Sequence, residues 1–412
     1  MLLTETNIRN LLVIGVDLVS LAASSRKAGY QVHAVSYFGD QDLEHACLET
    51  RSIVEQRSKE SCGRLSTNFS PERLLLLTKD LLRKNEIHGA LLSSGLDDSP
   101  DVLFELNELI PIIGNRPENI KRVRHKAKFF RELRRLQIPH PETAIVEDPH
   151  EAKRRSKDIG FPVLVKPLSG FGGAGIRKVK NNQELKQAFQ DASRFKEESL
   201  IQEHISGIPA SVSLISTTNE AVALTLNEQL LGISEVGQKE PFGYCGNVVP
   251  FSTTKATVNK CKSVAKRIAL QFSLVGSNGV DLVISEEGIP YVVEVNPRFQ
   301  GTLECVERTL SMNIVEAHVG ACFHRKLPTV EETPSAYCVR LLLFAPQRST
   351  VPDLGIFEEA RDVPLSQVII EEGEPLCSIV VDGTSRNSSL REAKNMAKLI
   401  QRLLRRIDHP SS

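Results

Sequence analysis

The chain has 412 residues, more than a single hydrophobic core usually serves, so we expect two to four domains. Its 51 Lys and Arg residues balance 51 Asp and Glu residues, which leaves no net field to attract nucleic acid or an anionic membrane. It has no Trp and few aromatic residues, which disfavours a base-stacking surface, and no apolar run is long enough to span a bilayer.

Eight cysteines are scattered through the sequence, without a C-x-x-C pair and without a histidine at zinc-binding spacing. This pattern is typical of free thiols in a reducing compartment, so we expect a cytoplasmic protein. Residues 11–23 are apolar enough to suggest the core of a signal peptide, but Asp17 interrupts them and no clear small-residue cleavage site follows. A first strand and helix explain this stretch better.

The first part of the chain has the pattern of a small α/β domain. Its expected elements are a strand at 10–16, a helix at 18–28, a strand at 31–36, a helix from Ser70 and Pro71, and strands at 90–94 and 110–114. A dinucleotide-binding fingerprint would need three glycines after the first strand, and only Gly15 is present, which disfavours that function. Asp97 and Asp98 follow a strand end, where parallel sheets meet ligands, but a solvated acidic loop is the simpler interpretation.

A helix from Lys126 to about Leu136 comes next, with most of its charges on what would be a solvent-facing side. The strand FPVLVKP at 161–167 then places Lys166 among apolar residues, where its ammonium group needs an anionic partner.

A glycine-rich loop follows this strand directly, in the run SGFGGAGIRK at 169–178. Gly170, Gly172, Gly173 and Gly175 leave backbone N–H groups exposed, and such groups can wrap phosphates. No G-K-S/T opens a helix here, so the loop differs from a P-loop. A strand with a lysine, then a glycine loop, then a second strand is a more specific signal for phosphate binding than the loop alone.

The most informative stretch runs from Val280 to Glu304. It predicts two strands, at 280–285 and 291–295, joined by a turn that ends in Gly288. Asp281 lies on the first strand, and the second carries oxygen and nitrogen groups on one face. These second-strand groups are Glu294 and Asn296, followed by Arg298. Facing oxygen donors suit Mg²⁺, and Arg298 adds a planar donor fork; a surface hairpin with solvated charges is the alternative.

The remaining elements are predicted strands and helices, of which the helix at 257–271 is amphipathic. We expect strands at 210–215 and 221–226, a polar glycine-rich loop from Glu235, a helix at 257–271, a helix at 303–320, strands at 336–344 and 377–381, and a terminal helix from a capping box at Ser389 to Ile407.

The motif D-x(12)-E-x-N-P-R, from Asp281 to Arg298, resembles the magnesium end of the ATP-grasp fold of carboxylate–amine ligases and biotin carboxylase. The resemblance covers 117–325 well and the flanks loosely. It implies an α/β (α+β) architecture: a small Rossmann-like domain at 1–116, a two-lobed ATP-grasp domain at 117–325 with a lid at about 142–206, and a C-terminal cap at 326–412. Members are often dimers, which also suggests a homodimer.

The resemblance also implies roles for individual residues. ATP would be bound by Lys126, Lys166, Gly172, Gly173, Gly175, Gln202, Glu203 and Ile205, with Lys128 as an alternative to Lys126 because His125 replaces the usual Asp or Asn. The metal ligands for Mg²⁺, or Mn²⁺ in its place, would be Asp281, Glu294 and Asn296. Arg298 and Asn296 would act in catalysis, and Tyr244 and Asn247 would contact the second substrate.

The activity implied is an ATP-dependent ligation of a small carboxylate to a small amine through an acyl phosphate, releasing ADP and phosphate. The run VEVNPRFQGTLE with the FGYCGN loop resembles an archaeal group of ATP-dependent carboligases that includes a tyramine–glutamate ligase. Two alternatives stay open. One is a biotin-carboxylase-like enzyme that activates bicarbonate, and the other is a non-catalytic ATP-binding regulator.

Overall fold

The computed structural model describes residues 8–64, 69–168, 170, 172–193, 198–330 and 336–408. Ser169 and Phe171, two positions of the predicted glycine loop, lie outside this set. Within the described part of the chain, no helix is long and apolar enough to cross a membrane. All eight cysteines are free thiols.

A four-stranded parallel sheet begins the chain, with strand order β3-β2-β1-β4. Its elements are β1 (Asn10–Gly15), α1 (Val19–Lys27), β2 (Gln31–Ser36), α2 (Gln41–Ala46), β3 (Glu49–Ser52), α3 (Pro71–Leu82), β4 (Gly89–Leu92) and α4 (Pro100–Leu109). The strand predicted at 110–114 is wrong: α4 continues to Leu109, and only Ile112 makes a single bridge, to Ala90.

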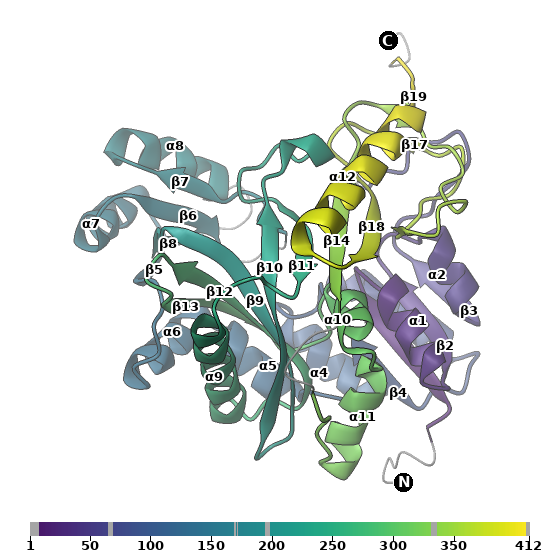
Figure 1. Ribbon diagram of the computed structural model, residues 1–412, viewed down its shortest axis with the longest axis horizontal. Coiled ribbons are helices and arrows are strands. Elements are labelled where there is room, and N and C mark those ends of the chain that lie inside the picture. Colours follow the sequence, from purple (N-terminus) through teal and green to yellow (C-terminus); the bar gives the residue numbers. More distant parts are fainter. Residues whose placement is uncertain are drawn as a thin grey trace.

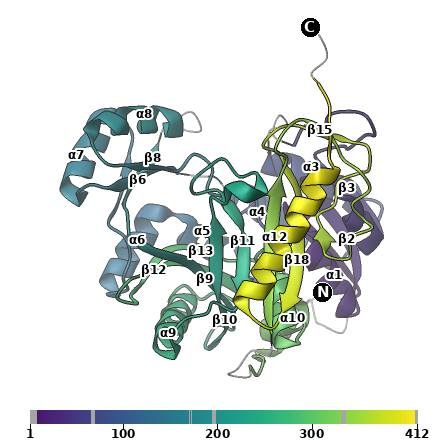
Figure 2. The same ribbon diagram turned by 45° about the horizontal axis from the view of Figure 1, so that its top comes forward.

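Two helices and a small antiparallel sheet, ordered β5-β8-β6-β7, come next. They are α5 (Pro117–Arg124), α6 (Lys126–Arg135), β5 (Thr143–Val146), α7 (Pro149–Ile159), β6 (Val163–Pro167), β7 (Arg177–Val179), α8 (Asn182–Ser193) and β8 (Ser199–Glu203). Figures 1 and 2 both place this sheet, with α7 and α8, at one end of the molecule and the N-terminal sheet at the other.

The central sheet has eight strands, in the order β13-β12-β9-β10-β11-β14-β18-β16. They are β9 (Gly207–Ser216), β10 (Ala221–Leu231), β11 (Tyr244–Val249), β12 (Gly276–Ser285), β13 (Pro290–Asn296), β14 (Tyr337–Phe344), β16 (Ala360–Arg361) and β18 (Pro375–Gly383). Because β14 and β18 pair directly beyond β11, the C-terminal part extends this sheet. The boundaries at 116 and 325 stay predictions.

Helices and short strands complete the chain. They are η2 (Ser234–Val236), α9 (Lys255–Gln271), α10 (Leu303–Leu310), α11 (Ile314–His324), β15 (Ser349–Thr350), β17 (Ile369–Ile370), α12 (Arg386–Leu403) and β19 (Arg405–Arg406). The single helix predicted at 303–320 is wrong, because Ser311 adopts a left-handed conformation (φ 51°) and Asn313 caps a new helix by accepting from the Glu316 N–H.

The capping box predicted at Ser389 is also wrong. Ser385 caps α12 by accepting from the Ser388 N–H, and Ser389 lies buried inside the helix. The helix begins as soon as β18 ends, so the earlier serine takes the capping position. It ends at Leu403 and not at Ile407.

Two of the hydrophobic clusters show how the other elements pack on the central sheet. One joins the first and last parts of the chain, with Leu12 and Ile14 of β1 packed with Val339 and Leu341 of β14. The other lies under α9, between the central sheet and α6. Its members include Phe129, Val212, Ile268 and Val280. Burial of these side chains fixes α6 against the β12–β13 hairpin, where the candidate site lies.

Candidate active site

The hairpin of β12 and β13 carries the predicted acidic residues opposite one another. Asp281 and Glu294 are cross-strand partners in the antiparallel register, and a bulge follows Asp281. Gly288 closes the turn with φ +71°, as the sequence predicted for this position. Asn296 points to the same side and donates from Nδ2 to Asp281 Oδ2 over 3.0 Å.

Glu294 lies between two cations. Its Oε1 is 2.5 Å from Lys126 Nζ and 2.7 Å from an Arg124 guanidinium nitrogen. Burial raises the pKa of Glu294, but Arg124 and Lys126 outweigh burial and hold that pKa well below its ordinary value. The two cations converge because α5 ends and α6 begins at His125, where the helical path breaks.

Lys166 reaches the same region from β6. It donates to Gln202 Oε1 over 2.7 Å, and Gln202 in turn donates to Thr143 Oγ1 over 2.9 Å. Burial and the nearby charge of Lys126 lower the pKa of Lys166 to about 8, while Glu294 opposes them. Gln202 is buried, so its amide fixes the position of the lysine ammonium group.

A pocket of about 180 Å³ joins these side chains to the glycine loop. It is lined by Arg124, Lys126, Phe130, Lys166, Pro167, Leu168, Gly170, Gly172, Gly173, Ala174, Ile176, Leu200, Gln202, Val293 and Glu294. Gly172 and Gly173 have φ of +66° and +76°, which L residues with side chains rarely adopt. Cationic side chains and a glycine backbone in the lining of one pocket suit a polyphosphate.

The oxygen donors of the hairpin fit a divalent cation. Burial and the charge of Glu294 raise the pKa of Asp281 to about 6, with Arg298 opposing them. A metal bound here would stabilise the two partly buried carboxylates at facing positions of the hairpin, and Asn296 would add an amide oxygen. Mg²⁺ and Mn²⁺ both accept such a set.

Arg298 is fixed by the loop after β4. Its Nε donates to Asp97 Oδ2 over 2.8 Å, and its other nitrogens donate to Phe299 O and Asn296 Oδ1. Asp98 accepts two hydrogen bonds of 2.7 Å from Arg124. The solvated acidic loop preferred from the sequence is therefore wrong, because both aspartates hold arginines of the site.

Several other predicted nucleotide residues do not line this pocket. Glu203 accepts from the Glu142 N–H over 3.1 Å, and neither it nor Ile205 lines the pocket. Gly175 also has a positive φ, of +74°, but does not line it. Lys128, the alternative to Lys126, is exposed on α6 and does not line the pocket either. The roles of these residues stay predictions.

Tyr244 and Asn247 lie together on β11, where the Tyr244 hydroxyl donates to Asn247 Oδ1. Burial raises the pKa of Tyr244 well above its ordinary value, with Arg340 opposing. Arg340 of β14 pairs with Asp17 at 2.7 Å and donates to the Gly301 carbonyl. A Cβ at Gly301 would meet Asp17, Arg340 and the Tyr244 hydroxyl within 3.6 Å, so these groups form a polar region beside the metal hairpin.

Sequence reasoning missed three of these charged residues: Arg124, Asp17 and Arg340. Arg340 carried a usable signal, since it is a lone charge in the apolar strand CVRLLLF, as Lys166 is in its own strand. Arg124 carried a weaker signal: it ends a helix two residues before Lys126, a predicted ATP-binding residue.

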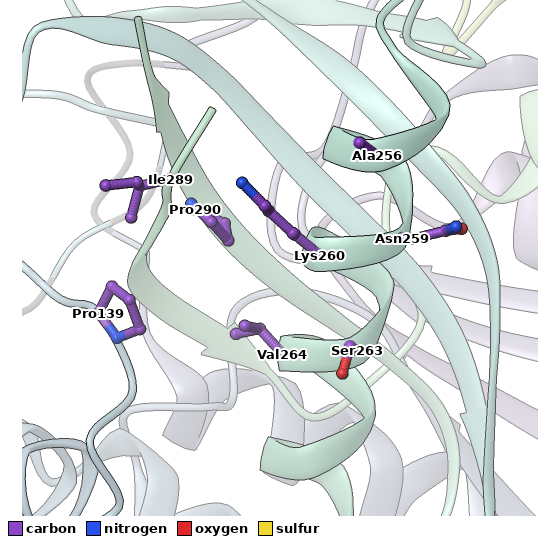
Figure 3. Close-up of a pocket in the computed structure, with 8 residues that line it drawn as sticks. All are labelled: Pro139, Ala256, Asn259, Lys260, Ser263, Val264, Ile289 and Pro290. Carbon is purple, nitrogen blue, oxygen red and sulfur yellow. The ribbon is translucent and has the colours of Figure 1, made fainter. Parts of the chain in front are cut away.

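A larger open groove of about 560 Å³ lies on the outer side of the hairpin. Figure 3 shows Lys260 and Val264 of α9 on one side of it, with Ile289 and Pro290 on the other. Lys260 is the single charged residue among the eight that line it. The groove lacks the convergence of cations, carboxylates and glycines found in the smaller pocket.

Residues 123–302 match the family model described as an ATP-grasp domain. The pocket and the β12–β13 hairpin both lie within this matched region, so the candidate site belongs to an ATP-grasp domain. The chain is 26% identical over 375 residues to an uncharacterized protein of Methanocaldococcus jannaschii, covering 90% of this chain and 87% of that protein. It is also 26% identical over 240 residues to the carbamoyl phosphate synthase large chain of Pseudomonas putida, covering 57% of this chain but only 22% of that protein.

Two solved structures share the fold. The biotin carboxylase domain of Hydrogenobacter thermophilus 2-oxoglutarate carboxylase, in complex with MgADP, ADP and bicarbonate, has a TM-score of 0.73 at 18% identity, covering 96% of this chain and 90% of that one. The N5-carboxyaminoimidazole synthase of Aspergillus clavatus, in complex with ADP and 5-aminoimidazole ribonucleotide, has a TM-score of 0.71 at 14% identity, covering 96% and 100%.

Proposed function

We propose that this chain is an ATP- and Mg²⁺-dependent ligase that joins a small carboxylate to a small amine. The observation that carries the proposal is the convergence of Arg124, Lys126 and Lys166 with Glu294 at one glycine-bordered pocket. The ATP-grasp domain supports the general class, an ATP-dependent ligase of the carboxylate–amine or carboxylase type. The specific substrates belong to the proposal.

The cations would hold the triphosphate, and the glycine loop would cover it and exclude water. Mg²⁺ bound by Asp281, Glu294 and Asn296 would neutralise charge on the transferring phosphoryl group. Arg298, oriented by Asp97, lies two residues beyond Asn296 and would bind the substrate carboxylate or the phosphoryl oxygens.

The chemistry needs no nucleophile from the protein. A carboxylate oxygen attacks the γ-phosphorus, the bond from that phosphorus to the β,γ-bridging oxygen breaks, and ADP leaves. The amine nitrogen then attacks the acyl carbon, the bond from that carbon to the phosphate oxygen breaks, and phosphate leaves as the amine gives up one proton. Positioning and charge stabilisation supply the catalysis of the first step. The second substrate would lie near Tyr244 and Asn247, next to the hairpin.

A second candidate is a biotin-carboxylase-like activation of bicarbonate, since a biotin carboxylase domain of the same fold was solved with bicarbonate bound. Bicarbonate is itself a small carboxylate-like anion, so the same pocket would serve it. A tyramine–glutamate pair is one specific carboxylate and amine to include in any test.

The test is release of ADP by the purified protein with Mg²⁺ and ATP, across a panel of amino acids, amines and bicarbonate. We expect ADP only when a carboxylate and an amine are both present, and none from Glu294→Gln. Glu287→Gln, an exposed glutamate in the same hairpin turn, is the matched control and should behave as wild type. ADP release with bicarbonate alone would support the second candidate, bicarbonate activation. Tight ATP binding without turnover would indicate a non-catalytic regulatory protein.

A further inference from the structure

The turn between β10 and β11, residues 232–243, is a compact loop with its own internal contacts. The Gly232 N–H donates to the Gly243 carbonyl over 2.8 Å, which closes the loop at its base. A Cβ at Gly232 would overlap the Pro241 carbonyl oxygen, so the two arms pack directly on one another. Figure 1 shows this β10–β11 turn reaching up beside the small sheet that carries β7.

Three contacts join the β10–β11 turn to the glycine loop. The Tyr244 N–H donates to the Gly172 carbonyl over 2.9 Å. Gly173 packs so closely on the Phe242 carbonyl that a Cβ at this glycine would overlap it. The Arg177 guanidinium pairs with both carboxylate oxygens of Glu240, and each side chain is about one-third exposed (36% and 37%).

Each of these contacts lies next to a residue of the proposed reaction. Gly172 and Gly173 line the phosphate-binding pocket, and Arg177 begins the strand that leaves the loop. Tyr244 is the first residue of β11, directly after the turn, and donates from its hydroxyl to Asn247. The nucleotide side and the second-substrate side therefore meet at one small interface.

The other side of the β10–β11 turn is anchored to the C-terminal part of the chain. Lys239 pairs with Glu372 at 2.6 Å, and Lys394 of α12 pairs with Glu235 at 3.1 Å. A Cβ at Gly237 would meet the Phe344 carbonyl of β14 at 2.5 Å. The turn is thus held on the central sheet independently of its contacts with the glycine loop.

We propose that Arg177 and Glu240 are positioning residues that latch the glycine loop to the β10–β11 turn. Through this latch, the position of the loop over the nucleotide sets the position of Tyr244 at the second-substrate site. A second substrate that fixes Tyr244 would in turn fix the loop over the nucleotide. The coupling rests on the proposed function and is reciprocal, because any factor by which one ligand improves the other's affinity acts equally in both directions. A partly exposed ion pair supports a coupling factor of roughly two- to five-fold.

The latch is tested by the rate of hydrogen–deuterium exchange at the Tyr244 N–H, which donates to the Gly172 carbonyl. Without any nucleotide, we expect exchange in the peptide 238–249 to be roughly two- to five-fold faster in Glu240→Gln than in wild type. The double variant Arg177→Glu/Glu240→Arg should restore the wild-type rate. Lys239→Gln removes the neighbouring exposed ion pair and should leave the rate at Tyr244 unchanged.

A second measurement adds Mg²⁺ and a non-hydrolysable ATP analogue, adenylyl imidodiphosphate. In wild type and in Lys239→Gln, exchange should slow both in the glycine loop (172–179) and in 238–249. In Glu240→Gln, exchange should slow in the glycine loop (172–179) but not in 238–249. Equal slowing of 238–249 in Glu240→Gln and wild type overturns the latch, as does an unchanged rate in the nucleotide-free comparison.

The two proposals fail in different ways. If the analogue protects neither region of wild type, ATP binding is overturned, while the nucleotide-free rates still decide whether the latch exists. Two glycine variants sharpen that comparison: Gly172→Ala and Gly173→Ala carry similar positive-φ strain, but only the second inserts a methyl group into the Phe242 carbonyl. We expect faster exchange at Tyr244 in Gly173→Ala than in Gly172→Ala, and equal rates would count against the latch.

Discussion

Arg298 and Asp97 form an ion pair across 201 positions of sequence, with Nε and Oδ2 2.8 Å apart. Both side chains are largely buried, with 14% and 8% of their surface exposed. The pair joins the end of the metal hairpin to the loop after β4, so the N-terminal sheet holds a residue of the active site in place.

The substitution Asp97→Asn should therefore affect both stability and turnover. Arg298 keeps the Asn296 and Phe299 oxygens as acceptors but loses its counter-charge, so we expect the free energy of unfolding to fall by about 3 kcal/mol. ADP release should fall more than nucleotide affinity, because Arg298 is no longer fixed. Urea denaturation and steady-state kinetics measure the two effects. Asp101→Asn, at an exposed position of α4, is the control, and equal stability of the two variants would contradict the prediction.

Arg124 lies between Asp98 and Glu294 and has 9% of its side chain exposed. Replacing Arg124 by Gln removes a positive charge that pairs with the carboxylates of Asp98 and Glu294. The free energy of unfolding should therefore fall by about 3–5 kcal/mol at pH 7. In wild type, the lowered pKa of Glu294 contributes stability that is present above pH 4.5 and is lost as pH falls toward the lower folded-state pKa. Arg124→Gln loses much of that contribution, so its deficit should shrink below about pH 4.5. Denaturation of both proteins as a function of pH tests this, and a deficit independent of pH would contradict it.

Because of the lowered pKa of Lys166, we expect nucleotide binding to be accompanied by the uptake of a proton. A pKa of about 8 for Lys166 means that near pH 8 roughly half of the molecules carry a neutral amine. A bound polyphosphate favours the ammonium form and raises this pKa, so binding should take up about half a proton at pH 8 and weaken as pH rises further.

Calorimetry in buffers of different ionisation enthalpy measures that proton directly, with Mg²⁺ and adenylyl imidodiphosphate as the ligand. Lys166→Arg keeps the positive charge but does not titrate in this range, so its proton uptake should be close to zero. Equal uptake by wild type and Lys166→Arg would assign the proton to another group.

Phe129 anchors the helix that carries Lys126. Its ring packs against Phe130 and Phe272 at centroid distances of 5.4 and 5.5 Å, and its side chain is fully buried. Phe129→Ala should lower the free energy of unfolding by about 3–5 kcal/mol through lost burial and a residual cavity. Leu48→Ala, at a position 64% exposed, should change stability by less than about 0.5 kcal/mol. Chemical denaturation compares the two, and similar losses would contradict the burial argument.

The sequence predicted the hairpin well because its information is local. Asp281 and Glu294 face one another once two short strands and a glycine turn are recognised, and Lys166 stands out as one charge in an apolar strand. Asp97 was assigned to a solvated loop and Arg124 was not recognised, because surface loops and helix ends also carry such charges. Their burial arises only when the N-terminal sheet, α5 and the hairpin come together in the folded chain.

The same distinction applies to the helices. The start of α3 at Ser70 and Pro71 follows from local capping chemistry and was predicted. The break between α10 and α11 was not, since the run 303–320 contains no Gly or Pro before Gly320 and the interruption depends on Ser311 and Asn313.

Because β14 pairs with β11 in the central sheet, a fragment that stops at residue 325 would leave β11 as an open edge. Five of its six residues are buried in the full chain, so such a fragment would present an apolar strand with unpaired backbone groups to its neighbours in solution. We expect it to associate edge to edge and precipitate. Soluble expression would then need the sequence through β18, even for studies confined to the nucleotide site.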